Sequence, residues 1–125
     1  MKREATDAAR MTEEERARYE GLATVFKALA HPTRLFIVNK LAEEPYCVCD
    51  LTTLVGADTS TISKHLSVLK NAGLVTDTKQ GTSVYYSLSC GCMNQLFAGA
   101  QTVMRANLDR FRRIVEGDPG RVPEE

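Results

Sequence analysis

Hydrophobic residues recur in the first half of the chain at the three- and four-residue spacing of amphipathic helices. They do so between Leu22 and Leu29 and again between Leu35 and Ala42. The dipeptide His31-Pro32 separates the two stretches, because proline cannot continue one helix but fits the first turn of the next. His31 is therefore expected to be a turn residue rather than a ligand. The pattern predicts two helices joined at a tight corner.

The middle of the chain predicts a helix-turn-helix. Tyr46-Cys47-Val48 favours an extended conformation because of its β-preferring side chains, and a short apolar stripe then leads to Gly56. Asp58, or one of the two hydroxyl residues after it, can cap the next helix, whose apolar face starts at Ile62 and which ends near Gly73. Two short helices joined by a glycine-containing turn form the helix-turn-helix motif.

The next segment predicts a β-hairpin. Leu74 to Thr78 and Thr82 to Leu88 are β-branched and aromatic runs, and Lys79-Gln80-Gly81 separates them. A helix-turn-helix followed by a hairpin is a winged helix, whose second helix enters the DNA major groove while the hairpin reaches the backbone or the minor groove. The expected fold class is therefore mainly α with a small β-hairpin.

A long apolar stripe from about Cys92 to Val115 predicts a final helix of roughly 35 Å. A domain of this size has a radius of gyration of about 14 Å, so one protomer cannot easily cover the whole stripe. We expect the helix to pair with a second copy, which predicts a homodimer. The residues expected at the dimer interface are Leu22, Phe26, Met93, Phe97, Val103, Met104 and Phe111.

Composition and charge narrow the class of protein. The chain has 125 residues, and 16 Lys and Arg balance 16 Asp and Glu. No run of about 18 apolar residues is present and the N-terminus is charged, so we expect no transmembrane span, no signal peptide, no membrane partner and a cytoplasmic location. The zero net charge argues against indiscriminate nucleic-acid coating, so any DNA binding must be local. No nucleophile, base and orienting group stand together, so an enzyme is not expected.

The domain limits follow from these patterns. We expect residues 1–18 to form a mobile charged arm, residues 19–116 to form the winged helix-turn-helix DNA-binding and dimerisation domain, and residues 117–125 to form a disordered tail. The exposed face of the second motif helix carries short hydroxyl groups, a cation and an imidazole that suit phosphates and base edges. These candidate DNA-binding residues are Thr59, Ser60, Thr61, Ser63, Lys64 and His65. His65 can alternatively pack behind the helix, beside its core side.

The four cysteines form two Cys-X-Cys pairs, Cys47 with Cys49 and Cys90 with Cys92. In a reducing cytosol we expect thiols rather than structural disulfides, and an i, i+2 disulfide within one pair should be strained. Both pairs lie where a predicted strand passes into a helix. Extended chain projects residues i and i+2 to the same side, so the two thiols of a pair can reach one ion. A helix N-terminus favours thiolates, and thiolates select soft metal ions.

Several motifs together resemble the ArsR/SmtB family of small winged-helix, metal-responsive repressors. They are KALAHPTRLFIVNKL, CVCDL, STISKHLSVLKNAGLV and a hairpin that closes on VYYSL, in that order between about Gly21 and Leu88. The resemblance implies a homodimer that binds operator DNA, an imperfect palindrome, and leaves it when inducer binds. It also implies wing contacts from Lys79 and Gln80. Arg34 resembles a family arginine near the DNA-facing end, although it could instead pair with Glu43 or Glu44.

The CVCDL motif resembles the family's sensing motif, in which two cysteines bind trivalent arsenic or antimony, or cadmium or lead. Two departures stand beside it. Thr52 occupies the place where the arsenic pattern often has a third cysteine, and Val103 and Ala106 cannot complete the family's site on the last helix. Arsenite or antimonite is the expected inducer, with cadmium, lead or zinc ions as the alternative and a thiol redox or persulfide sensor as a further one.

A shared cluster of both cysteine pairs would reconcile these departures. If the short strand at Tyr46-Cys47-Val48 pairs with the last wing strand, Cys90 would come near Cys47. The four cysteines would then form one metal site within a protomer, with three thiolates for trivalent arsenic or four for zinc or cadmium. In the alternative interpretation, Cys90 and Cys92 are bystander thiols. A permanently bound structural zinc is less favoured, because the apolar stripes already supply a core.

Overall fold

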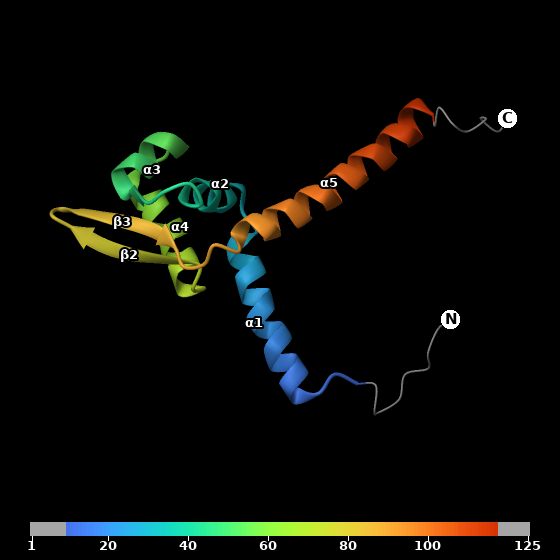
Figure 1. Ribbon diagram of the computed structural model, residues 1–125, viewed down its shortest axis with the longest axis horizontal. Coiled ribbons are helices and arrows are strands. Elements are labelled where there is room, and N and C mark those ends of the chain that lie inside the picture. The colour runs from blue at the N-terminus through green and yellow to red at the C-terminus, as the bar shows by residue number, and fades with distance from the viewer. Residues whose placement is uncertain (1–9, 118–125) are drawn as a thin grey trace. The chain divides into compact units, whose positions relative to one another are not determined.

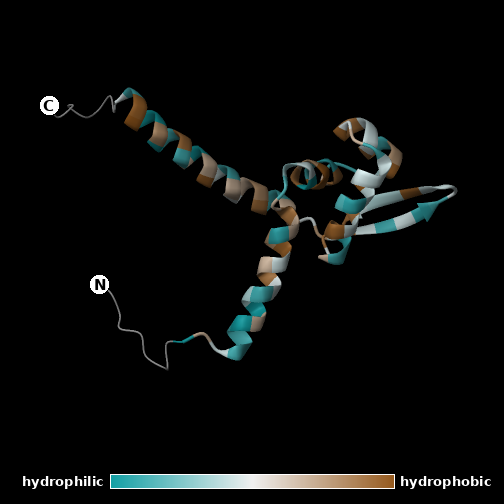
Figure 2. Cartoon of the chain, turned by 180° about the vertical axis from the view of Figure 1, so that it is seen from behind, coloured by the Kyte–Doolittle hydropathy of each residue, from teal (hydrophilic) through white to brown (hydrophobic). Residues whose placement is uncertain are grey.

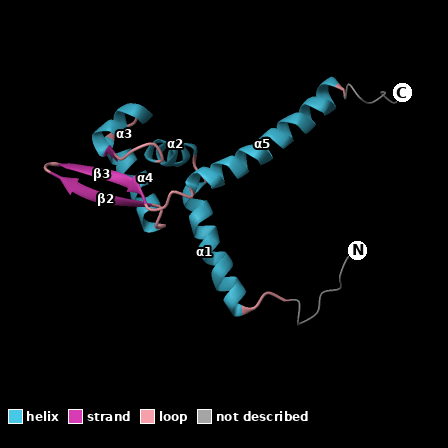
Figure 3. Ribbon diagram, viewed as in Figure 1, coloured by secondary structure: helices cyan, strands magenta, loops and turns pink. Residues whose placement is uncertain are grey.

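The computed structural model of the protein describes residues 10–117 (Figure 1). Five helices and three strands follow one another in this part of the chain (Figure 3). In chain order they are α1 (Glu13–Leu29), α2 (Pro32–Leu41), β1 (Tyr46–Cys47), α3 (Val48–Val55), α4 (Thr59–Asn71), β2 (Val75–Gln80), β3 (Ser83–Leu88) and α5 (Met93–Glu116). The mainly helical fold class with a small sheet is confirmed.

The first helix begins earlier than the sequence pattern suggested. Thr12 and Glu15 form a capping box, in which the Thr12 side chain accepts from the Glu15 amide and the Glu15 carboxylate accepts from the Thr12 amide. This pair supplies partners for amides at the start of the helix. Residues 13–18 at the end of the predicted arm are therefore part of α1. Residues 1–9 and 118–125 of the predicted arm and tail lie outside the described residues.

The core of the winged-helix unit joins α2, α3, α4 and the first residue of β2. Its fully buried side chains are Ile37, Val38, Leu51, Ile62, Leu66, Leu69 and Val75. The three from α4 are the predicted apolar face, and Leu51 anchors α3 beside α4. Among the described residues no polar or charged side chain is buried. Burial of this apolar surface fixes α4 within the unit and leaves its other face in solvent.

The turn between α3 and α4 has the features that the sequence predicts. Gly56 ends α3 with φ +81°, a left-handed conformation that glycine adopts without a steric penalty. Asp58 then caps α4, because its carboxylate accepts from the Thr61 amide at 2.8 Å. At the other end of α4, Gly73 has φ +80° and Leu74 donates to the Leu69 carbonyl. This is a Schellman motif, which ends the helix and starts the hairpin.

The wing is an antiparallel hairpin with a shorter connection than expected. Gln80 pairs with Ser83, so only Gly81 and Thr82 make the turn, and Gly81 has φ +65°. Lys79 therefore belongs to β2 instead of the connection. The short strand β1 adds to the other edge of β3, giving the order β1-β3-β2. The predicted pairing of the Tyr46 segment with the last wing strand is confirmed.

The described chain divides into two compact units, one that ends at Cys90 and one that begins at Gly91. The second unit contains α5, a helix of 24 residues whose apolar and polar turns alternate along its length (Figure 2). Six of its apolar side chains are more than half exposed in the chain by itself, namely Val103, Met104, Leu108, Phe111, Ile114 and Val115. No helix of the described part is long and apolar enough to cross a membrane.

The expected interface residues fall into two groups. Leu22, Phe26, Val103, Met104 and Phe111 are exposed, as a contact with a second copy requires. Met93, by contrast, is only 4% exposed, and Phe97 is half-buried. Met93 is therefore corrected from an interface residue to a buried residue of the protomer, because its side chain is already removed from solvent.

Candidate functional site

The solvent face of α4 presents the side chains that the sequence assigned to DNA. A helix turns by about 100° per residue, so the residues between the buried positions 62, 66 and 69 point away from the core. Ser60, Thr61, Ser63 and Lys64 are all exposed, and so is Thr59 in the first turn. Lys79 and Gln80 are exposed at the end of β2. Hydroxyl groups and two lysines thus lie on one helix and the neighbouring hairpin.

The start of α4 is held by Asp58. Its carboxylate accepts from the Thr61 amide and, at 3.3 Å, from the Ser60 hydroxyl. The hydrogen bond from the Thr61 amide is the main reason why the pKa of Asp58 lies below its usual value. The anionic cap therefore persists at neutral pH and fixes the first turn of α4, the helix that carries the candidate DNA-binding hydroxyl groups.

The end of α4 is tied to the wing by an ion pair. Lys70 Nζ lies 3.0 Å from both carboxylate oxygens of Asp77 on β2. The hydrogen bond to Asp77 raises the pKa of Lys70 above its ordinary value. Lys70 therefore neutralises the Asp77 carboxylate at the base of the wing. The other lysines of these two elements, Lys64 on α4 and Lys79 on β2, are exposed to solvent.

His65 does not share the fully exposed face of α4. It is half-buried, its ring centroid lies 4.5 Å from that of His31, and its Nδ1 lies 3.3 Å from Nη1 of Arg34. Its assignment to the DNA-facing surface is therefore corrected: the ring faces the corner between α1 and α2. Arg34 pairs with neither Glu43 nor Glu44 in the described contacts, because its guanidinium donates to the Ala28 carbonyl and reaches His65.

The Cys47–Cys49 pair is oxidised in the structure. A disulfide joins Cys47 and Cys49, whose Cα atoms are 5.3 Å apart, within the roughly 4.4–6.8 Å that such a bond spans. Cys90 and Cys92 are also disulfide-bonded, so no cysteine of the described chain is a free thiol. The expectation of free thiols is thus wrong, and the bond joins the two members of one pair, where the sequence predicted strain. The reason lies in the backbone: Cys47 is extended, with ψ 162°, and α3 begins at the next residue, which turns both side chains to one side.

Three potential metal ligands gather at the start of α3. The two sulfur atoms of the pair and a carboxylate oxygen of Asp50 lie within 4.8 Å of one another, and they form the one such group found in the described residues. Cys47 is buried, whereas Cys49 and Asp50 are exposed. Cys47 caps α3, since its Sγ accepts from the Asp50 amide at 3.2 Å. This group offers two soft sulfur ligands and one hard oxygen ligand at a helix N-terminus.

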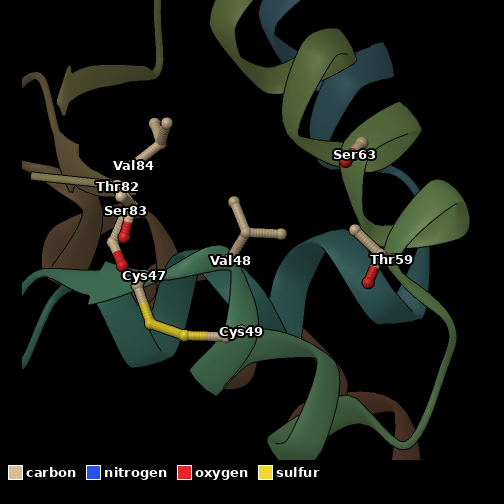
Figure 4. A pocket seen from close by; sticks show the side chains of 8 residues that line it. All are labelled: Cys47, Val48, Cys49, Thr59, Ser63, Thr82, Ser83 and Val84. Carbon is tan, nitrogen blue, oxygen red and sulfur yellow. A yellow bond between two sulfur atoms is a disulfide. The ribbon is translucent and has the colours of Figure 1, made fainter.

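The pair opens into a pocket that also borders the DNA-facing helix. Figure 4 shows the disulfide on one side of this pocket and Thr59 and Ser63 of α4 on the other, with the side chain of Val48 pointing between them. Residues 82–84 at the tip of the wing complete the lining, and the volume is about 340 Å³. A ligand held by the cysteines would therefore lie close to the start of the DNA-facing helix.

The second cysteine pair does not join this ligand group. Cys47 is the partner of Tyr85 in the antiparallel β1–β3 ladder, and β3 then runs away from it. Cys90 follows Tyr85 by five residues, which corresponds to about 16 Å of extended chain. The Ser89 amide donates to the Leu74 carbonyl, so the chain is still extended one residue before Cys90. The strand pairing was predicted correctly, but its direction carries Cys90 away from Cys47.

Sequence reasoning missed Asp50 as a ligand and the polar contacts of Arg34. Asp50 is part of the quoted CVCDL motif, and its place in the first turn of a helix capped by Cys47 was the available signal. The contact between Arg34 and His65 joins residues 31 positions apart in the chain. No local pattern indicates such a contact, because it depends on the angle at which α2 and α4 pack.

Comparison with known proteins agrees with the fold. Residues 31–77 match the family described as "Bacterial regulatory protein, arsR family". A "Cadmium resistance transcriptional regulatory protein CadC homolog" of Staphylococcus aureus is 43% identical over 76 residues, covering 60% of this chain and 63% of that protein. The "Arsenical resistance operon repressor" of Escherichia coli K12 is 48% identical over 66 residues, which cover 52% of this chain and 56% of that protein. The chain thus aligns with somewhat more than half the length of these two relatives.

A solved structure covers more of the chain. The homodimeric winged helix-turn-helix DNA-binding domain of a possible ArsR-family regulator from Mycobacterium bovis is 33% identical, with a TM-score of 0.70. The match covers 79% of this chain and 92% of that one. The chain thus carries a winged helix-turn-helix of the DNA-binding kind found in this class of transcriptional regulators. It belongs to the ArsR family of bacterial regulatory proteins.

Proposed function

We propose that this protein is a homodimeric repressor that leaves its operator when Cys47 and Cys49 bind a thiophilic metal or metalloid ion. The observation that carries the proposal is the convergence of both sulfur atoms at the start of α3, on a pocket that also borders Thr59 and Ser63 of α4. Two relatives named for cadmium and arsenical resistance support a response to such ions.

Dimerisation is part of the proposal because of the exposed stripe on α5 and the homodimeric relative. Side chains such as Met104 and Phe111 are 59% and 65% exposed in the single chain. A contiguous apolar stripe of this kind is typical of a helix that packs against a partner. Two copies of α4 would then meet successive major grooves about one helical turn apart, which suits an imperfectly palindromic operator.

Release would begin at the thiols. The disulfide between Cys47 and Cys49 must first take up two electrons and two protons from a dithiol or glutathione-type reductant, because the same sulfur atoms are the ligands. The freed thiolates would then move to positions around an ion, and Cys47 would lose the geometry in which it caps α3. Leu51 of α3 packs in the same core as α4, so a shift of α3 would change the orientation of α4.

Arsenite or antimonite is the proposed inducer, because the two sulfur ligands of Cys47 and Cys49 suit a soft trivalent metalloid. Arsenic and antimony bind sulfur strongly, and a third thiolate could come from Cys90 or Cys92 only after the chain rearranges. A divalent ion is the second candidate, and the observation that favours it is Asp50. Zinc, cadmium or lead can accept a carboxylate oxygen beside two sulfur ligands, as zinc does in many sites.

A thiol redox sensor is a further candidate on the same scaffold. The observation that favours it is the disulfide itself, since closing or opening this bond changes the cap of α3 without any ion. The two mechanisms differ in what releases DNA from the reduced protein. An ion releases it in the first mechanism, and an oxidant releases it in the second.

The test is fluorescence anisotropy of the reduced protein on its own promoter DNA, without oxygen, titrated with each ion in turn. We expect arsenite, antimonite or one of the divalent ions to lower DNA affinity by about 5-fold to 150-fold, the usual range of allosteric coupling. The proposal is wrong if every ion leaves the affinity unchanged. Release by an oxidant alone would favour the redox sensor.

A further inference from the structure

A second polar cluster lies at the corner where α1, α2 and α4 meet, and the proposed metal response does not involve it. Arg34 of α2 donates from Nε to the Ala28 carbonyl at 2.6 Å and lies 3.5 Å from the Lys27 carbonyl through Nη2. Its Nη1 lies 3.3 Å from Nδ1 of His65 in the middle of α4. One guanidinium thus connects the C-terminal end of α1 to the DNA-facing helix.

The direction of these hydrogen bonds fixes the protonation of both imidazoles. A guanidinium has only donors, so Nδ1 of His65 must present a lone pair to Arg34. His31 has the same requirement, because its Nδ1 accepts from the Thr33 amide at 3.1 Å and caps α2. An imidazolium carries a proton on both nitrogens and cannot accept. Protonation of His65 would therefore set two donors against each other and break its contact with Arg34.

The charges around His65 also disfavour its protonated form. Burial is the main reason why the pKa of His65 lies below its ordinary value of 6.5, and His31 and Arg34 lower it further. The side chains that contact His65 at this corner are both basic: His31, which caps α2, and Arg34 on α2. No carboxylate is among the groups that shift His65 in the described chain.

We propose that Arg34 is a positioning residue for DNA binding and that Arg34, His31 and His65 form a proton-sensitive latch that holds α4 in its DNA-reading orientation. The latch requires a neutral His65, and protonation opens it. The proposal concerns only DNA binding by α4, so it stands or falls independently of metal sensing at Cys47 and Cys49.

The sign of the pH effect distinguishes a latch from ordinary electrostatics. Added positive charge on a DNA-binding surface strengthens binding, because it releases more counterions from the phosphates. A latch predicts the opposite, since α4 loses its anchor as the pH falls below 6.5 and the imidazole takes up a proton. At higher pH His65 is neutral whether the latch is closed or open. The DNA affinity should therefore be constant there.

The experiment measures DNA affinity by anisotropy between pH 8.0 and 5.5 for the reduced full chain, with a chelator and at constant ionic strength. The probe is a duplex selected for tight binding to the wild type at the higher pH. We expect the affinity of the wild type to fall by about 5-fold or more on acidification, the lower end of typical coupling. Circular dichroism at the lower pH checks that the protein stays folded.

Three variants separate the latch from a merely structural role. His65→Asn keeps an acceptor for Arg34 but cannot take up a proton, so we expect wild-type affinity at high pH and no loss on acidification. Arg34→Lys keeps the charge but not the forked donor, so we expect weaker binding at high pH and a flatter pH profile. His31→Asn retains a helix cap and should reduce the pH effect only in part.

Two results would overturn the latch. The first is a wild-type affinity that stays constant or rises as the pH falls. The second is an acid-dependent loss in His65→Asn as large as that of the wild type. If His65→Asn does not fold, the pH profile of Arg34→Lys decides, because a profile as steep as that of the wild type is incompatible with the latch.

Discussion

Cys47 lies opposite Tyr85 in the antiparallel β1–β3 ladder, so the residue that caps α3 also belongs to the sheet of the wing. A change at Cys47 therefore has two routes to the DNA-binding surface. One passes through α3 and Leu51 to α4, and the other passes directly into β3. Both routes lie within one protomer.

This relationship predicts that ion binding changes the wing as well as the helix-turn-helix. We expect amide hydrogen exchange in reduced protein to change on addition of the inducing ion in β1, in the first turn of α3 and in β3 around Tyr85. The exchange of α5 serves as an internal reference, because this helix belongs to the other compact unit of the chain. A change in exchange confined to α3 would show that the β1–β3 pairing does not transmit the effect of ion binding to the wing.

Oxidation is expected to block ion binding, because the disulfide uses the sulfur atoms that the ion needs. The double variant C90S,C92S leaves only the Cys47–Cys49 pair and isolates the effect. Equilibrium dialysis should find ion bound to its reduced form and none bound to its oxidised form. Equal binding by both forms would mean that the ligands lie elsewhere.

The substitution Asp50→Asn should distinguish the two classes of inducer. Loss of the carboxylate removes a favourable ligand for a divalent cation but removes nothing that a trivalent metalloid needs. We expect DNA release by cadmium or zinc to require about 10-fold to 100-fold more ion, as for losses of a metal-site contact, while release by arsenite is unchanged. Glu44→Gln is the matched control, since it removes a nearby exposed charge outside the ligand group. Loss of the arsenite response in Asp50→Asn would contradict this division of roles.

The exposed stripe on α5 predicts dimerisation through this helix. Phe111→Glu places a charge on a side chain that is 65% exposed in the single chain and central to the stripe, so we expect monomers in light scattering at micromolar concentration. Ala106→Glu is the matched control, because Ala106 is exposed on the opposite side of the same helix. Dimers that persist in Phe111→Glu, or dissociate equally in Ala106→Glu, would place the interface elsewhere.

Local patterns predicted most of the fold and part of the site. The turn at Gly56, the cap at Asp58 and the apolar face of α4 follow from short-range chemistry, and the structure contains them as expected. The start of α1 was misplaced because the capping box of Thr12 and Glu15 lies in a segment with few apolar residues. In such a segment hydrophobic periodicity gives no signal, whereas cap chemistry does.

Contacts between distant segments could not be predicted with the same success. The sequence indicated that β1 pairs with β3, but not that the antiparallel direction carries Cys90 away from Cys47. His65 was assigned to DNA from its place on α4, yet the packing of α2 against α4 turns it toward Arg34. Both errors concern three-dimensional direction, which depends on crossing angles and register and not on residue type.

The central claim is that the Cys47–Cys49 pair is the switch, and the most direct test is operator release by the inducing ion in two matched variants. We predict that reduced C47S,C49S binds operator with wild-type affinity and retains it at every ion concentration. We also predict that reduced C90S,C92S is still released, although more ion is needed if a third thiolate contributes. Release of C47S,C49S at the ion concentration that releases the wild type would contradict the account.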